Sequence, residues 1–455
     1  MREFIVLPKN RKHFYTTLFL VLIFIICFFE GFLHRNFDYL FTACIRDSSL
    51  TQSLSYYPHG YMFDDDVGNH KLHAEGYALA INTYKMATIF KKKSNLSKLS
   101  AQYTPDKYRV FPSFLASFLL YFLSLNNAYF IINLLCWMLV AFSIWWLGKR
   151  IFNSMIIGFI AAFLCATSYT MIIFSSGVKA EIFQLSFYVI LIALALFLEH
   201  FSDDISKQGL INSFLLGIFS GLGIFAGGAT VYFIPFLIFY GLMVMNFKKF
   251  LIRNLFLVIG CLLVYFSINS FIDQGKSASV LSWIFGHGFN LSKWFYTFKS
   301  RILNHFIFLI PLPLWFGAIF GLFMLKVKES KIILCIASVF IASEIIMCGA
   351  NPYQWYTPAA YYLQLIFPIY FLNARFIYFL ILERRNNSKS FLIFIKRVLA
   401  AIFILLILFM SNIRLIGNKY FFYNALSPIP VEIFHHSYFT FDNIYLYEKV
   451  SKEKL

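Results

Sequence analysis

The sequence predicts an all-α protein, a polytopic transmembrane helical bundle of about eleven spans, and three observations predict it. Hydrophobic residues make up 60% of the 455 residues and charged residues only 13%, which is far less charge than a soluble protein of this size carries. The apolar residues fall in runs of about twenty, the length that crosses the hydrocarbon core of a bilayer. Short basic clusters separate these runs. Residues 1–455 are therefore expected to form a single transmembrane domain.

The first apolar run, Tyr15–Phe32, follows a basic start and has no small-residue cleavage site after it. We therefore predict an uncleaved span rather than a signal peptide. The other spans are expected at Ala128–Leu147, Ser154–Ser175, Phe183–Phe201, Leu210–Ala226, Ala229–Met245, Asn254–Ile272, Leu303–Leu325, Ile332–Gly349, Pro358–Leu382 and Val398–Ile416.

Lysine and arginine set the predicted orientation. The N-terminal cluster and the clusters near residues 149, 207, 248, 326 and 384 fall on one side of the membrane, which the positive-inside rule makes cytoplasmic. The first loop (34–126, with interfacial helices), the loop 273–302 and the tail 417–455 are then extracytoplasmic. This orientation requires that Val110–Leu125, an apolar stretch near Pro112, is an interfacial or re-entrant helix. If that stretch crossed the membrane, every later orientation would invert.

The first loop contains three consecutive carboxylates, Asp64, Asp65 and Asp66, followed by His70 and His73. Adjacent carboxylates repel one another, so a cation or a function is expected to offset that cost. Asp64 and Asp66 are candidate ligands of a divalent metal such as Mg²⁺ or Mn²⁺, and any of the three is a candidate general base. A solvated acidic turn before a helix at Leu72–Phe90 explains the same residues equally well.

Basic and aromatic residues beside the predicted outer surface are candidate substrate ligands. Lys107 and Arg109 precede the interfacial helix, where a guanidinium can hold a phosphate through two hydrogen bonds. His287 and Arg301 lie in an aromatic loop, and Trp355 lies in a polar outer turn. Lipid headgroup anchors and an aromatic belt explain the same residues.

The net charge of +18 does not predict a nucleic-acid partner, because the basic residues cap apolar runs and match no nucleic-acid-binding motif. Membrane lipid is the expected partner. The seven cysteines have no metal-binding spacing. Glu344 lies inside an apolar run, where a carboxylate is either functional or a structural hydrogen-bonding group.

Three sequence segments carry a resemblance to a known family. They are Phe63-Asp64-Asp65-Asp66 with His70, the segment Ala74-Glu75-Gly76-Tyr77-Ala78-Leu79-Ala80, and Arg109-Val110-Phe111-Pro112-Ser113. The likeness continues through Leu125-Asn126-Asn127-Ala128-Tyr129 and Leu147-Gly148-Lys149-Arg150 and covers roughly residues 14 to 200. In this layout the chain resembles the GT-C superfamily of polyprenyl-phosphate-sugar-dependent glycosyltransferases, most of all the protein mannosyltransferases and the lipid A aminoarabinose transferases. Two details differ from the family pattern: the acidic pair is a triplet here, and Arg109 stands three residues before Pro112.

The resemblance implies an inverting transferase of a bacterial inner membrane with a cytoplasmic N-terminus. One aspartate of the triplet would be the base or a metal ligand. The donor would be a polyprenyl-phosphate-linked sugar whose phosphate is held by outer-face arginine or lysine, and the acceptor a glycan, lipid or protein. A transporter or flippase of a lipid-linked sugar or other solute is the alternative function, and would show Gly- or Pro-broken spans in paired halves. A polysaccharide polymerase or ligase would typically place its large loop late in the chain, whereas here the largest loop comes first.

Overall fold

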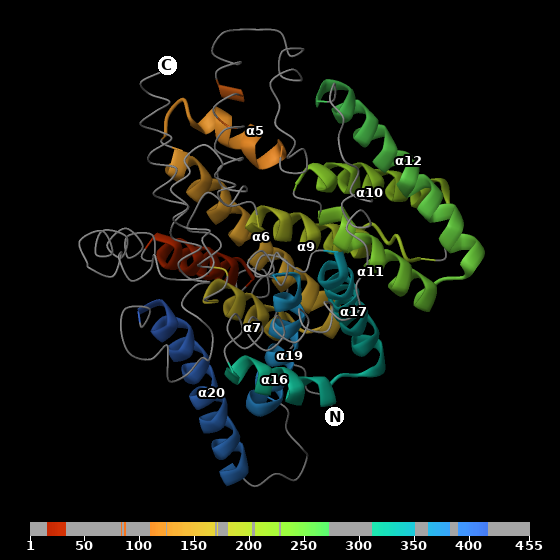
Figure 1. Ribbon diagram of the computed structural model, residues 1–455. Coiled ribbons are helices and arrows are strands. Elements are labelled where there is room, and N and C mark those ends of the chain that lie inside the picture. Colours follow the sequence, from red (N-terminus) through yellow and green to blue (C-terminus); the bar gives the residue numbers. More distant parts are fainter. Residues whose placement is uncertain are drawn as a thin grey trace.

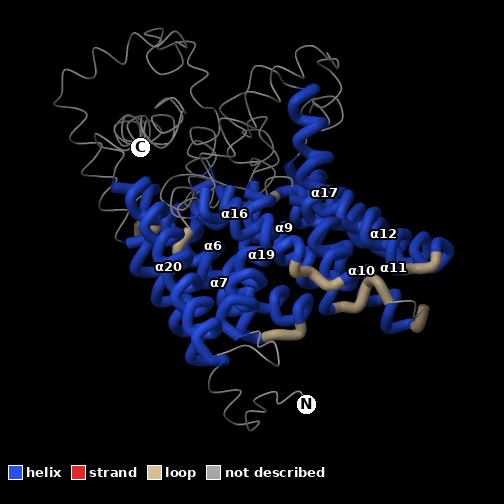
Figure 2. The backbone as a smooth tube through the Cα atoms, turned by 90° about the horizontal axis from the view of Figure 1, so that it is seen from below, coloured by secondary structure: helices blue, strands red, loops and turns tan. Residues whose placement is uncertain are grey.

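A computed structural model describes the structure of part of the chain, and every regular element in that part is a helix (Figure 1). The described residues are 16–32, 83, 86–87, 110–123, 125–168, 171, 181–202, 205–226, 229–272, 312–350, 363–382 and 390–416. Figure 2 shows that short loops connect many of these helices and that no strand occurs among them. The all-α prediction is thus confirmed for the described part.

The helices follow the apolar runs of the sequence. They are an N-terminal helix at Thr16–Phe32, α5 (Val110–Leu119), α6 (Leu125–Phe152), α7 (Met155–Ala166), α9 (Glu181–Phe197), α10 (Lys207–Phe225), α11 (Ala229–Val244), α12 (Phe247–Ile272), α16 (Leu312–Phe323), α17 (Val327–Ala350), α19 (Leu363–Leu382) and α20 (Ser390–Ile416). Each predicted span overlaps one of them. Within the described residues, three helices are long and apolar enough to cross a membrane: Asn127–Phe152, Lys207–Phe225 and Phe247–Ile268. About eleven spans therefore stays a prediction.

Local sequence signals account for several helix ends. Ser154 precedes α7 and its hydroxyl accepts a hydrogen bond from the backbone N–H of Ile157. Ser206 precedes α10 and caps it in the same way through the N–H of Gly209. Serine is favoured at this position because its oxygen satisfies an N–H that has no partner inside the helix. Asn153, in the tight turn between α6 and α7, adopts a positive φ of 49°, a conformation that asparagine tolerates better than most residues.

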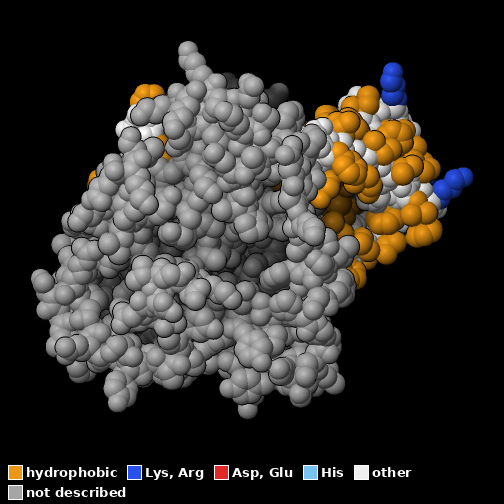
Figure 3. Space-filling view, turned by 45° about the horizontal axis from the view of Figure 1, so that its top comes forward, with side chains coloured by type: hydrophobic (Ala, Val, Ile, Leu, Met, Phe, Trp, Pro, Cys, Tyr) orange, Lys and Arg blue, Asp and Glu red, His pale blue; other side chains and the backbone are white. Residues whose placement is uncertain are grey.

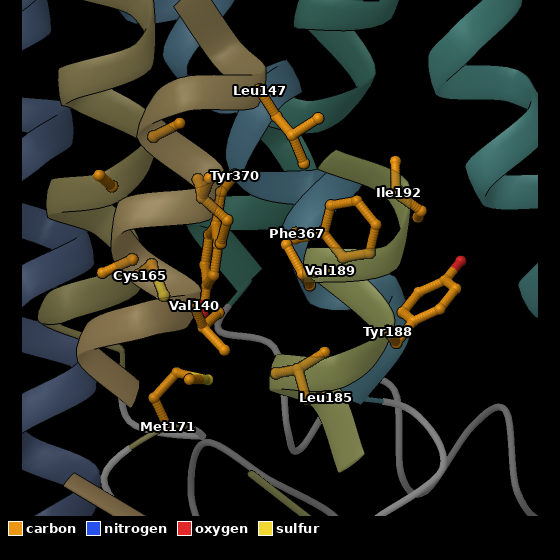
Figure 4. Packing of buried hydrophobic residues seen from close by; sticks show 14 of the residues in the cluster. Val140, Leu147, Cys165, Met171, Leu185, Tyr188, Val189, Ile192, Phe367 and Tyr370 are labelled. Carbon is orange, nitrogen blue, oxygen red and sulfur yellow. The ribbon is translucent and has the colours of Figure 1, made fainter. Parts of the chain in front are cut away.

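The core lies where α6, α7, α9 and α19 pack together. The sequence puts glycine where α6 and α7 touch, because a Cβ on Gly148 would lie 2.7 Å from the Cα of Gly158. Nearby, the indole N–H of the fully buried Trp137 donates to the carbonyl oxygen of Cys165 across the same interface, at 3.2 Å. Figure 4 shows Phe367 and Tyr370 of α19 inserted between α6 and α9.

The pair α10 and α12 forms a second packing unit beside this core (Figure 1). Its interface contains small residues spaced four apart on α10, namely Gly217 and Gly221. This spacing places them on one helix face, and a Cβ on Gly221 would lie 2.7 Å from the Cβ of Val264. Small residues in this pattern allow the backbones of membrane helices to approach closely.

The candidate spans differ in how deeply they are buried. The apolar window of α6 is 67% buried, whereas that of α12 is only 17% buried. Figure 3 shows hydrophobic side chains over the projecting α10–α12 region, with lysine or arginine at its margin. The exposed side chains of α12 include Leu255, Leu262 and Phe266. An apolar surface of this kind suits lipid as its solvent.

Basic residues gather at one end of the bundle. Lys149 and Arg150 lie in the last turn of α6, Lys207 begins α10, and Lys248 and Lys249 begin α12. Contacts at the end of α9 join these helix ends: Trp146 of α6 packs on Phe197, and Asn212 of α10 and Arg253 of α12 donate to carbonyls just after Phe197. The assignment of this end to the cytoplasm remains a prediction from the positive-inside rule.

Candidate functional site

The first loop leaves and rejoins the bundle at the same end of α6. Gly31, near the end of the N-terminal helix, packs so closely that an added Cβ would lie 3.2 Å from Leu134 and 3.7 Å from Phe130 of α6. At its other end, the same helix approaches the start of α7, where the Thr16 hydroxyl contacts the Met155 sulfur. The chain between residues 33 and 124 therefore begins and ends near the first turns of α6. We call this the loop end of the bundle.

Helix α5 lies at the loop end and has ten residues. A ten-residue helix rises about 15 Å, half of the hydrocarbon thickness, so α5 does not cross a bilayer as a single helix. Pro112 fits because it lies in the first turn, where no intrahelical N–H is required. The extracytoplasmic placement of this loop stays a prediction.

The two ends of α5 differ in character. Near its start Phe111 packs edge-on against Phe183 and Phe187 of α9, with ring centroids 5.5 and 5.8 Å apart. Near its end Phe118 is exposed, and so are Tyr121 and Phe122 in the turn that follows. A short helix that is docked at one end and exposes aromatic side chains at the other suits a position at a membrane interface.

Three buried hydroxyl groups meet where the first loop contacts α6. The Tyr129 hydroxyl of α6 lies 2.9 Å from the Thr83 hydroxyl of the first loop and 3.3 Å from the Ser113 hydroxyl of α5. Each of the three side chains is fully buried. We call this set the hydroxyl clamp, since it joins three separate segments of the chain. Buried hydroxyl groups are costly unless they are hydrogen-bonded, so this geometry favours one docked arrangement.

An apolar contact lies next to the hydroxyl clamp. Met86, one helical turn beyond Thr83, forms a small buried cluster with Phe225 of α10, against which Phe114, Ile224, Tyr265 and Ile268 pack. Phe225 and Tyr265 are stacked with centroids 6.1 Å apart. Thr83 and Met86 thus connect the first loop to α6 and to the ends of α10 and α12, and they also lie against α5 within the loop. Thr83, Met86 and Ala87 belong to the helix predicted at Leu72–Phe90 and are helical.

The predicted site residues themselves lie outside the described residues. These are Asp64, Asp65, Asp66, His70, His73, Lys107, Arg109, His287, Arg301 and Trp355. The side chain of Glu344, within α17, also lies outside them. In the described part of the chain, no group of three or more histidine, cysteine, aspartate or glutamate residues could hold a metal ion. The catalytic, substrate and metal assignments therefore remain predictions.

Sequence reasoning missed the hydroxyl clamp, although Ser113 and Tyr129 lie inside segments that carry the family resemblance. Single hydroxyls in apolar helices usually bond to their own backbone, as Ser117 does by donating to the carbonyl of Phe114 at 2.6 Å. Nothing local separates Ser113 from Ser117. The partner of Tyr129 in the first loop is 46 residues away, and periodicity alone does not reveal such a contact.

A second polar cluster lies at the opposite, basic end, in the turn after α9. His200 is fully buried there and its Nδ1 lies 3.0 Å from the Ser213 hydroxyl of α10. Arg253 of α12 donates to the backbone carbonyl of Glu199 at 2.7 Å. Arg253 and Asn212, which donates to the carbonyl of Leu198, satisfy carbonyls that the end of α9 leaves without helical partners.

Burial lowers the pKa of His200 to about 4, and the positive charge of Arg253 acts in the same direction. His200 is therefore neutral at physiological pH, as a buried imidazole beside a guanidinium must be. The helix α9 ends at Phe197, so the predicted span Phe183–Phe201 is shorter in the structure and His200 follows it. This cluster is a helix cap that connects α9, α10 and α12.

Comparisons with known proteins return no match of any kind: no family model, no curated protein and no solved structure is significantly similar to this chain.

Proposed function

We propose that this protein is an integral-membrane glycosyltransferase that moves a sugar from a polyprenyl-phosphate donor to an acceptor on the extracytoplasmic face. The chain is multi-pass in this proposal, with its N-terminus in the cytoplasm of a bacterium and its body in the inner membrane. The acceptor is a glycan, a lipid or a protein. The membrane-spanning part of the proposal is supported by helices that are long and apolar enough to cross a bilayer.

The observation that carries the proposal is the Asp64-Asp65-Asp66 triplet within the first loop. Both ends of this loop lie at the loop end of the bundle, and its helix at Thr83 docks on α5 and α6. A polar loop of this length with a defined docking point is more typical of a functional site than of a simple connection between helices, because long loops in compact proteins usually carry function. The triplet supplies the carboxylates that transfer to a hydroxyl requires.

The proposed reaction is a single displacement. One aspartate of the triplet takes the proton of the acceptor hydroxyl, and the acceptor oxygen attacks the anomeric carbon of the donor sugar. The bond between that carbon and the phosphate oxygen breaks, so polyprenyl phosphate leaves and the anomeric configuration inverts. Lys107, Arg109, His287 and Arg301 are the candidates that stabilise the charge on the departing phosphate. His70, His73 and Trp355 are the candidates that contact the sugar.

The transporter alternative expects Gly- or Pro-broken spans in paired halves. The sequence has one feature of this kind, the glycine-rich segment Gly221–Gly228. Helix α10 is nevertheless continuous from Lys207 to Phe225, and Gly217 and Gly221 contact α12. Within the described part of this segment, glycine therefore serves helix packing, and the feature no longer favours transport.

The test uses purified protein in lipid nanodiscs, a panel of undecaprenyl-phosphate-linked sugars, and an envelope extract as the acceptor. Release of undecaprenyl phosphate and transfer of label to the extract are measured. We expect release by the unaltered protein and a loss of at least 100-fold in one or more of Asp64→Asn, Asp65→Asn and Asp66→Asn, the scale of removing a general base. Asp47→Asn, in the same loop, is the matched control.

Two results would contradict the proposal. One is full activity in all three variants, which would remove the triplet from the reaction. The other is movement of the intact donor across the bilayer of a proteoliposome without release of undecaprenyl phosphate, which would identify a flippase.

A further inference from the structure

Tyr129 occupies an unusual position because its hydroxyl group is the meeting point of three segments. It lies near the start of the most buried candidate span, α6, and its hydroxyl lies 2.9 Å from that of Thr83 and 3.3 Å from that of Ser113. A hydrogen bond depends on distance and angle far more sharply than an apolar contact does. The hydroxyl clamp therefore fixes the register of the first loop on the bundle.

Thr83 and Met86 lie three residues apart in a helix, so they share one face. That face places Thr83 on α6 and Met86 against Phe225 of α10. One contact is polar and directional, and the other is apolar and adaptable, since methionine fills irregular gaps. Two contacts on different helices fix the direction of the loop helix as well as its position.

We infer that Tyr129 is a positioning residue that docks the first loop for sugar transfer. This inference rests on the proposed function, because Thr83 belongs to the same loop as the Asp64-Asp65-Asp66 triplet. Tyr129 does not take part in the chemistry. It holds the segment that follows the triplet against a rigid helix, and small displacements of reacting groups cost large factors in rate.

The experiment compares Tyr129→Phe, Thr83→Val and the double variant with the matched control Ser117→Ala. Ser117 is equally buried on α5, but its hydroxyl bonds to the carbonyl of Phe114 in its own helix. Hydrogen exchange around Thr83 and Met86 reports docking without any need for activity. We expect exchange to be about fivefold faster in Thr83→Val, the factor that corresponds to one net hydrogen bond, and at least as fast in Tyr129→Phe, which also loses the bond to Ser113. The double variant should exchange little faster than Tyr129→Phe, because Thr83→Val removes a bond that Tyr129→Phe has already removed.

Kinetics then separate positioning from folding. In Tyr129→Phe we expect kcat for release of undecaprenyl phosphate to fall about fivefold or more while KM for the donor stays nearly unchanged. The melting temperature should match that of Ser117→Ala. Unchanged exchange around Thr83 in Tyr129→Phe would overturn the docking role. A melting temperature well below that of Ser117→Ala would overturn it too, because the effect would then be global.

The failure of this inference can be told from the failure of the proposed function. If the unaltered protein releases no undecaprenyl phosphate, sugar transfer is wrong, and with it the kinetic role of Tyr129. The exchange measurement alone then supports or overturns docking. If the unaltered protein is active and Tyr129→Phe exchanges faster but keeps its full kcat, the proposed function stands and the positioning role of Tyr129 is wrong.

Discussion

Substitution of Gly217 by alanine tests how α10 and α12 are held together. A Cβ at this position would lie 2.8 Å from the carbonyl carbon of Leu257 and 3.0 Å from its Cα, and closer still to its carbonyl oxygen. All three atoms belong to the backbone of α12, so no side-chain rotation relieves the clash. The two helices must therefore separate by about 1 Å, a displacement that forfeits a quarter to a half of the dispersion attraction between facing atoms.

The sign of the effect follows from two opposing terms. Alanine is favoured over glycine in a helix interior by about 1 kcal/mol. Overpacking a close contact costs about 1 to 3 kcal/mol, and apolar burial does not compensate, because lipid is as apolar as the interface that is lost. We expect Gly217→Ala to lower the free energy of unfolding by about 1 kcal/mol, and Gly217→Val by about 3 kcal/mol.

The assay is equilibrium unfolding of the detergent-solubilised protein by increasing mole fractions of dodecyl sulfate, followed by tryptophan fluorescence. The control is Leu215→Phe, which adds volume to α10 at a side chain that is 39% exposed. We expect the control to unfold like the unaltered protein. If Gly217→Ala stabilises the protein, or changes the midpoint no more than the control, close backbone packing does not hold α10 and α12 together.

Two other predictions concern buried groups on the same bundle. The pKa of His200 is lowered to about 4 by burial, so the unfolded chain binds more protons below pH 6.5, and stability should fall by about 3 kcal/mol as the pH drops from 6.5 towards 4. Unfolding at pH 7 and pH 4 measures this loss, and a His200→Gln variant that keeps the same pH dependence would assign it to other groups. Trp137→Phe removes the bond to the Cys165 carbonyl and leaves a cavity, so it should cost about 1 to 3 kcal/mol. Trp146→Phe at a half-buried position is the comparison, and an equal loss there would refute the special role of Trp137.

The helices were predictable from sequence because a membrane restricts the possible backbone structures. A chain in lipid must satisfy its backbone hydrogen-bonding groups internally, so a run of about twenty apolar residues is expected to form a helix. The short stretch at Val110–Leu125 was distinguished by its length, and α5 ends at Leu119. Helix ends were less predictable. Helix α12 begins at Phe247, ahead of the predicted Asn254. The predicted start was late because the first turns carry lysine, which lowers the mean hydropathy by which a span is recognised.

Burial was not predictable from composition. In a soluble protein the apolar face of a helix identifies the core, but α6 and α12 are both apolar all round, and their burial differs between 67% and 17% of the apolar window. The useful signal was the size of side chains rather than their polarity. Gly217 and Gly221 are four residues apart and identify the face of α10 that contacts α12. The candidate site was not predictable for a different reason. Its hydroxyl clamp joins Thr83 and Tyr129, which are 46 positions apart in the sequence.

The position of the hydroxyl clamp on α6 has a physical explanation in the rigidity of that helix. A loop that must hold reacting groups to a fraction of an ångström needs a rigid support, and rigidity comes from packing. Among the candidate spans α6 is the most buried. Trp137, farther along the same helix, is tied to α7 through the Cys165 carbonyl. A tyrosine on α12 would offer the same hydroxyl on a helix whose apolar window is only 17% buried. If the first loop carries the chemistry proposed for it, α6 is thus the helix on which its docking point is expected to lie.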